Sequence, residues 1–180
     1  MMRIRTVLAA MAFLALSASM AQAADLPLKA FFGHYQGNGI AESSDSLYFG
    51  VTMRDMDVVI EPSAQGFFVT WTTVIRQGGD PSNPDIRRKG TEIEFLPTQN
   101  PSVFKSATAR DPLDGGQLAW ARISETTLVV YLMTIDESGV YSVQSYARTL
   151  TGEGMELVFR RITDGQSTRE VHARLVKVAN

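Results

Sequence analysis

Residues 126–178 read TTLVVYLMTIDESGVYSVQSYARTLTGEGMELVFRRITDGQSTREVHARLVKV, and this stretch decides the fold. It contains four extended runs rich in β-branched and aromatic residues, which are the side chains that favour strands. Three short breaks separate the runs, and each break carries Gly together with Asp, Ser or Thr, as tight turns do. Four strands joined by three short turns form an antiparallel meander.

The chain before this stretch continues the strand pattern. Residues 67–76 alternate with period two, and shorter strands are expected at 91–96, around 103–105 and at 117–123. From Leu47 to Ile60 the apolar side chains change parity, which predicts either a β-bulge or a turn near Arg54 and Asp55, and we favour the bulge. Nine or ten strands with almost no helical periodicity make the chain all-β. We predict an antiparallel meander that closes into a barrel, with a β-sandwich as the alternative.

The first strand carries a local resemblance. An apolar lead-in, residues 26–32, is followed by Gly33-His34-Tyr35. This Gly-x-aromatic opening resembles that of the lipocalins and their calycin relatives, although their usual aromatic residue is Trp. The resemblance implies an up-and-down barrel that carries a small apolar ligand. It also implies an Arg from a late strand packed on the aromatic ring. Arg160, Arg161 and Arg174 are the candidates for this role.

The N-terminus predicts export. Arg3 and Arg5 precede 14 small and apolar residues and then Ala21-Gln22-Ala23, which is the pattern of a cleaved secretory signal peptide. We therefore expect residues 1–23 to be removed and residues 24–180 to form one β-barrel domain. No later segment is long and apolar enough to span a bilayer as a helix, so the product is expected not to cross the membrane after cleavage.

Charge and cysteine content restrict the environment and the partners. Loss of the two arginines leaves 15 basic residues against 19 acidic ones, a net charge of −4. Nucleic-acid binding needs clustered positive charge, so this balance gives it no support. The chain has no cysteine, and an exported protein without disulfides favours a bacterial periplasm as its location.

Sequence motifs for catalysis and for metal binding are missing. There is no nucleophile elbow and no set of closely spaced ligands for zinc or calcium. Only His34 and His172 could act as a general base, and both fall in expected strands far apart in sequence. We therefore predict a protein that is not an enzyme, with no cofactor and no metal.

Two irregular tracts, residues 77–89 and 97–116, interrupt the strands and are the places where binding loops are expected. The leading hypothesis is a periplasmic barrel that binds a small, largely apolar ligand. The rival hypothesis is a solid-core envelope protein that acts as an interaction or assembly module for a protein partner. Aromatic side chains with one orienting arginine make up the predicted ligand-binding set: Trp71, Phe95, Trp120, Tyr131, Tyr146 and Arg148.

Overall fold

The computed structural model describes residues 24–43, 52–76 and 86–180, and over this part of the chain ten antiparallel strands form one closed barrel. Each strand pairs with its neighbours in sequence, and β1 closes the barrel by pairing with β10. The predicted all-β meander is confirmed, and the closed sheet replaces the sandwich alternative. The strands are β1 Gly33–Ser43, β2 Thr52–Pro62, β3 Phe67–Arg76, β4 Ile86–Pro97, β5 Val103–Ser106, β6 Leu118–Ser124, β7 Thr127–Ile135, β8 Tyr141–Leu150, β9 Gly154–Thr163 and β10 Gln166–Ala179.

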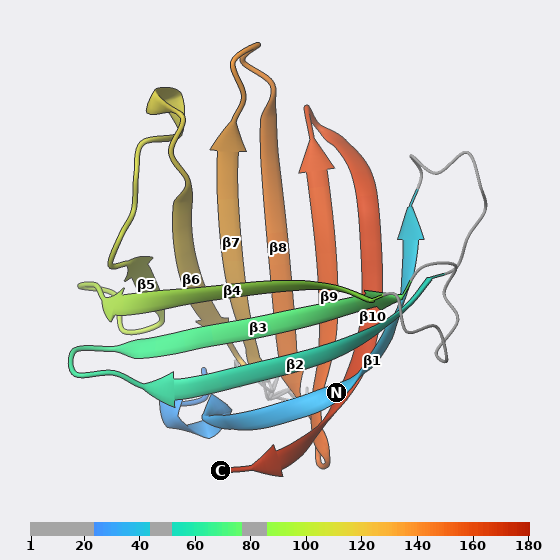
Figure 1. The fold of residues 1–180 in the computed structure, drawn as a ribbon. Helices are drawn as coiled ribbons and strands as arrows, with labels where there is room; N and C mark the ends of the chain where they lie inside the picture. The colour runs from blue at the N-terminus through green and yellow to red at the C-terminus, as the bar shows by residue number, and fades with distance from the viewer. Residues whose placement is uncertain (1–23, 44–51, 77–85) are drawn as a thin grey trace, which may run out of the picture.

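The strands of the barrel run in two crossing directions. Figure 1 shows β2, β3 and β4 running across β6 to β10 at a steep angle. Side chains that alternate along every strand fill the space inside the barrel, because successive residues of a strand point to opposite faces. On β7, for example, Leu128, Val130 and Leu132 are buried, whereas Val129 and Tyr131 between them are only half-buried.

The turns of the meander follow the predicted chemistry. Between β9 and β10 the chain turns through Asp164 and Gly165, whose φ angles are 49° and 79°. Two consecutive residues with positive φ make the turn that matches the right-handed twist of a hairpin. After β7, Asp136 Oδ1 accepts hydrogen bonds from the backbone N–H of Ser138 and of Val140. Short side-chain-stabilised turns therefore set the register of the last four strands.

Closure of the barrel depends on the first strand. A Cβ atom at Gly37 would overlap the backbone carbonyl of Arg174 on β10, so only glycine allows the two strands to lie this close. Tyr35 is 1% exposed, and its hydroxyl donates to the carbonyl of Phe31 at 2.9 Å. Lys177 Nζ lies 5.7 Å from the centroid of the Tyr35 ring. The cation over this ring is thus a lysine of β10.

The expected arginine partners of Tyr35 lie elsewhere. Arg160 and Arg174 are exposed on the outer face, whereas Arg161 faces the interior at the other end of β9. Because Arg161 comes seven positions after Gly154 at the Tyr35 end, it cannot reach that ring. The predicted contact of one of these arginines with the Tyr35 ring is therefore wrong, and Lys177 supplies the cation over that ring.

One end of the barrel is closed by the lead-in segment. The short 3₁₀ helix η1, Leu28–Phe31, places Phe31 in the core with no exposed surface. The Leu26 N–H donates to the carbonyl of Glu125 at 2.8 Å, which ties the segment to the β6–β7 turn. Asp25 accepts hydrogen bonds from Ser102 Oγ and from the Glu125 N–H, and these bonds lower its pKa. The end that η1 covers is called the closed end below.

Two strand predictions need correction. The predicted bulge near Arg54 is wrong, because the register of β2 runs without a shift past both β1 and β3. Residues 44–51, which carry the first part of that apolar pattern, lie outside the described residues. β4 begins at Ile86, so the irregular tract predicted at 77–89 ends earlier than expected, and residues 77–85 also lie outside the described part. The second tract contains the predicted short strand β5 and a 3₁₀ turn, η3, Pro112–Asp114.

Candidate functional site

The interior of the barrel holds a cavity of about 340 Å³. It opens away from the closed end, because its lining comes from the ends of strands opposite to those that contact η1. Apolar and aromatic side chains line its deeper part: Met56, Val58, Trp71, Leu132, Tyr146, Leu157, Phe159 and Val171. Basic and neutral polar side chains line the rest: Arg54, Thr72, Thr73, Lys89, Thr91, Gln117, Gln144, Arg161 and Arg169, beside Ile75.

Three aromatic rings form one wall of the cavity. Tyr146 lies between the other two, with its ring centroid 4.9 Å from that of Trp71 and 4.8 Å from that of Phe159. The hydroxyl of Tyr146 donates to Gln144 Oε1 at 3.0 Å, and burial raises the pKa of Tyr146. The phenol is therefore neutral at physiological pH. This wall offers a flat apolar surface to a bound molecule.

Arg148 lies beneath the aromatic wall and has no exposed surface. Its guanidinium carbon is 5.2 Å from the Trp71 ring centroid and 5.5 Å from that of Tyr146, within the range of cation–π contacts. Nη1 donates to the carbonyl of Tyr146 at 3.3 Å, whereas Nε and Nη2 are buried with no hydrogen-bond acceptor among the described residues. Burial lowers the pKa of Arg148 from its ordinary value to about 10.

Three further arginines face the interior above the aromatic wall. Arg161 on β9 and Arg169 on β10 are direct partners across the strand pair, an arrangement in which like charges repel. Arg54 comes from β2, and its pKa is lowered by burial and then by the positive charges of Arg169 and Arg161. The Nε atom of each of the three is buried without a hydrogen-bond partner in the described structure. We call Arg54, Arg161 and Arg169 the arginine cluster.

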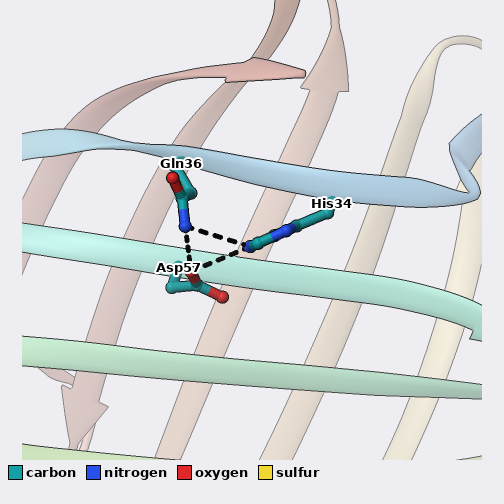
Figure 2. A network of polar contacts seen from close by, with 3 residues as sticks. All are labelled: His34, Gln36 and Asp57. Carbon is teal, nitrogen blue, oxygen red and sulfur yellow. Dashed lines mark hydrogen bonds and ion pairs between the residues drawn. The ribbon is translucent and has the colours of Figure 1, made fainter. Parts of the chain in front are cut away.

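The outer face of the same strands is different, because its charges are paired. Arg160 Nη2 lies 3.0 Å from Glu170 Oε1, and His172 Nε2 lies 2.7 Å from the same oxygen. Figure 2 shows the side chains of His34 and Gln36 on β1 converging on Asp57 of β2.

The distances to Asp57 Oδ2 are 2.8 Å from His34 Nε2 and 2.7 Å from Gln36 Nε2. Burial alone would raise the pKa of Asp57, but the hydrogen bonds from His34 and Gln36 outweigh it and lower that pKa. The carboxylates of Asp57 and Glu170 therefore lie on the outer face, where other side chains already pair with them.

The two histidines do not form one site. In the β1–β10 pair, His34 lies opposite Ala179, whereas His172 lies opposite Ile40. Six residues of strand separate them, which is about 20 Å at 3.3 Å per residue. Each contacts its own carboxylate on the outer face, outside the cavity. The arrangement that a His-dependent enzyme would need, both histidines beside one carboxylate in a cleft, is not present.

The predicted ligand-binding residues divide into three groups. Trp71 and Tyr146 line the cavity, whereas Arg148 contacts both rings from behind and is not part of the lining. Phe95 is fully buried at the closed end, where it stacks on Phe67 at 5.4 Å between ring centroids. It does not line the cavity.

Trp120 and Tyr131 lie outside the barrel. Their rings stack on each other at 4.8 Å with an interplanar angle of 13°. On β6 the buried residues are Ala119, Ala121 and Ile123, which gives Trp120 the opposite parity. The expectation that these two rings line the interior is thus wrong.

The arginine cluster is the part of the site that sequence reasoning missed. A usable signal was present, since Arg54, Arg161 and Arg169 each lie two residues from a buried apolar side chain on the same strand: Met56, Phe159 and Val171. Residues two apart share a face of a strand, so these arginines continue the inward face. This signal is weak by itself, because arginine is seldom buried without a partner.

Within the described ranges, no group of three or more histidine or carboxylate side chains is placed to hold a metal ion. No helix among these residues has the length and apolar character to cross a membrane.

Comparison with known proteins gives one similar structure. No family model matches the chain, and no curated protein matches it. Among solved structures, the chain is similar to the S-type phycobiliprotein lyase CPES from Guillardia theta. The two chains are 8% identical with a TM-score of 0.36, over 83% of this chain and 89% of that chain. At this identity and TM-score, the similarity assigns no function to the chain.

Proposed function

We propose that this protein is an exported, non-catalytic β-barrel that binds a small, largely apolar molecule in its interior. The observation that supports this proposal is the cavity beside Trp71, Tyr146 and Phe159. Its volume, about 340 Å³, falls in the range of small-molecule sites, about 300–1,000 Å³. Flat aromatic walls with a few polar groups are also typical of such sites.

The two tryptophans provide a direct test. In ¹⁵N-labelled protein each indole N–H gives its own signal, and Trp120→Phe identifies which signal belongs to Trp71. Titration with N-phenyl-1-naphthylamine, a neutral apolar probe, is expected to shift the Trp71 signal to saturation. The Trp120 signal is expected to stay in place, because that ring lies outside the barrel. Saturable movement of the Trp120 signal with a fixed Trp71 signal would contradict the proposed site.

A matched pair of variants checks the location. Val171→Phe adds a ring to the cavity wall and is expected to abolish or weaken probe binding. Val129→Phe makes the same change on the outer face of β7 and is expected to leave binding unchanged. Overpacking costs about 1–3 kcal/mol, so circular dichroism must show that both variants remain folded. Native mass spectrometry of protein purified without denaturation is expected to show a retained lipid-sized adduct.

Export is the second part of the proposal and rests on the N-terminal sequence. Cleavage after Ala23 predicts a mature protein that begins at Ala24 and is recovered in the periplasmic fraction. N-terminal sequencing and cell fractionation measure both. A chain that keeps Met1, or that remains with cytoplasmic markers, would contradict this part without affecting the cavity.

A protein-interaction module is the second candidate. The observation in its favour is the half-buried stack of Trp120 and Tyr131 on the outer face, since exposed aromatic residues are enriched at protein interfaces. If this surface serves a partner, Trp120→Ala should abolish a stoichiometric complex with an envelope protein and leave probe binding intact. A partner that still binds this variant would rule out the stack as the interface.

A further inference from the structure

A purely apolar ligand would leave the positive charges of the arginine cluster without a partner. Burying a charged group without a partner costs free energy, because the group loses its hydration. Here three guanidinium groups share one cavity, and two of them are direct cross-strand neighbours. The described residues that line the cavity include no aspartate or glutamate. The positive charges that line this cavity therefore repel one another without a compensating carboxylate from the described lining.

The neighbouring residues show that the chain pairs its arginines when they face outward. Arg160 precedes Arg161 directly, points to the other face of β9 and forms an ion pair with Glu170 at 3.0 Å. Arg174 on β10 lies 3.6 Å from Glu156. Arginines of the same two strands thus have acidic partners on the outer face, and none inside among the described residues. The difference follows the two faces of the sheet rather than a general surplus of arginine.

The chemistry of the cluster favours an acidic group. Each guanidinium presents N–H donors in a planar fork that matches the geometry of carboxylate and phosphate oxygens. Gln144, the register partner of Arg161 on β8, also lines the cavity. Its Oε1 already accepts from Tyr146, so its side-chain NH₂ group remains as a further donor toward an anion.

The apolar part of the cavity determines the chemistry expected for the rest of the ligand. The aromatic wall of Trp71, Tyr146 and Phe159 begins two residues from the cluster along β9, since Phe159 and Arg161 share a face. A molecule with an acidic group between the arginines would place its apolar body against these rings. We propose that the ligand is an amphipathic organic anion, with its acidic group held by Arg54, Arg161 and Arg169. This inference rests on the proposed binding function and names the class of ligand.

A pair of probes with the same apolar body tests the inference. 8-Anilinonaphthalene-1-sulfonate carries an acidic group that N-phenyl-1-naphthylamine lacks. Hydrogen bonds to charged groups are expected to make the sulfonate bind about tenfold to a hundredfold more tightly than the neutral probe. Fluorescence titration gives both dissociation constants. The preference should largely survive ~0.5 M NaCl, because buried pairs are screened far less than surface charges.

Single substitutions locate the effect. Arg54→Gln, Arg161→Gln and Arg169→Gln are each expected to weaken sulfonate binding about tenfold and to leave the neutral probe unaffected or more tightly bound. Arg160→Gln is the matched control, because it removes an adjacent arginine that faces outward, and it should bind both probes as the wild type does. Removing one of three repelling charges is not expected to prevent folding, which circular dichroism checks.

The outcomes separate this inference from the function on which it rests. If both probes bind equally well, or if the preference for the sulfonate is unchanged in all three cluster variants, the ligand is not recognised through its acidic group. The cavity would then still be a site for a neutral apolar molecule. If neither probe binds, or neither shifts the Trp71 indole signal, the proposed binding function fails together with the inference.

Discussion

The two ends of the barrel interior differ in how well their side chains pack and how fully their hydrogen-bonding groups are satisfied. At the closed end, Phe67 stacks on Phe95 at 5.4 Å and meets Phe104 edge-to-face at 5.0 Å. The buried hydroxyl of Tyr35 there has its acceptor, the carbonyl of Phe31. The arginine cluster at the open end, and Arg148 deeper in the interior, have buried donor atoms without acceptors among the described residues.

This difference separates stability from function. Well-packed rings and satisfied hydrogen bonds stabilise the barrel, whereas the fully buried charge of Arg148 and the mutual repulsion within the half-buried arginine cluster destabilise it. Proteins tolerate such local costs at binding sites because the ligand later supplies the missing interactions. The closed end is therefore expected to hold the fold, and the open end to hold the ligand.

The largest expected effect comes from the closed end. Phe95→Ala removes a ring with no exposed surface, and such a change costs about 3–5 kcal/mol of unfolding free energy through lost burial and the cavity left behind. Chemical denaturation followed by circular dichroism measures this loss. Affinity for the neutral probe should change little, because Phe95 does not line the binding cavity.

Phe68→Ala is the matched control for this change, since Phe68 lies on the same strand as Phe67 but on its outer, half-buried face. Its cost should be clearly smaller. If Phe95→Ala left stability unchanged, or removed probe binding without loss of stability, the closed end would not be the stabilising half of the barrel.

A substitution of Arg148, in the interior above the closed end, is expected to raise the unfolding free energy. Arg148→Met replaces a fully buried, positively charged side chain by an apolar one that is also long and flexible. Loss of the two cation–π contacts lowers the stability. Removal of the buried charge raises it by more, because apolar residues often stabilise a protein interior better than even a buried ion pair does. We expect a net gain of about 1–3 kcal/mol in the ligand-free protein.

Arg122→Met provides the comparison, because Arg122 is exposed on β6 and its loss should change the unfolding free energy by no more than about 0.5 kcal/mol. Both variants are measured by denaturant unfolding without ligand. A loss of stability in Arg148→Met would mean that the buried guanidinium supports the fold through its contacts with Trp71 and Tyr146.

Sequence patterns were sufficient for the closed end and for the fold. Alternating β-branched and aromatic residues predicted β3 at residues 67–76, and the Asp and Gly turns predicted the last four strands to within two residues at most boundaries. These predictions succeed because the period of two and the turn conformations are local properties of the backbone. Gly33 and Tyr35 likewise marked the strand that closes the barrel.

The open end could not be predicted in the same way, because its inward face breaks the rule that apolar residues point inside. Arg54 occupies an inward position of β2, so the apolar pattern seemed to change parity there and suggested a bulge that does not exist. On β7 both faces are apolar, and pattern alone could not show that Leu132 faces the cavity while Tyr131 faces outward. Register with the neighbouring strands decides this, and register is a property of the folded sheet.

The smallest expected effect tests the outer face, where charges are paired. The pKa of Asp57 lies below its ordinary value of 3.8 in the folded protein, so near that pH the unfolded chain binds more protons. Stability contributed by this carboxylate is therefore present above the ordinary pKa and is lost as the pH falls toward the folded pKa. The Asp57 side chain is 40% exposed, so its contribution should stay well below about 1 kcal/mol.

Asp57→Asn is expected to lower the unfolding free energy slightly at pH 7 and to match the wild type once the carboxylate is protonated in both states. Urea denaturation from pH 7 down to pH 2.5 measures both curves. Arg161→Gln should shift stability by the same amount across this whole range, because a guanidinium stays protonated throughout. If Asp57→Asn gave an equally flat shift, its hydrogen bonds with His34 and Gln36 would not stabilise the ionised carboxylate, and the contrast between a paired outer face and an unpaired interior would weaken.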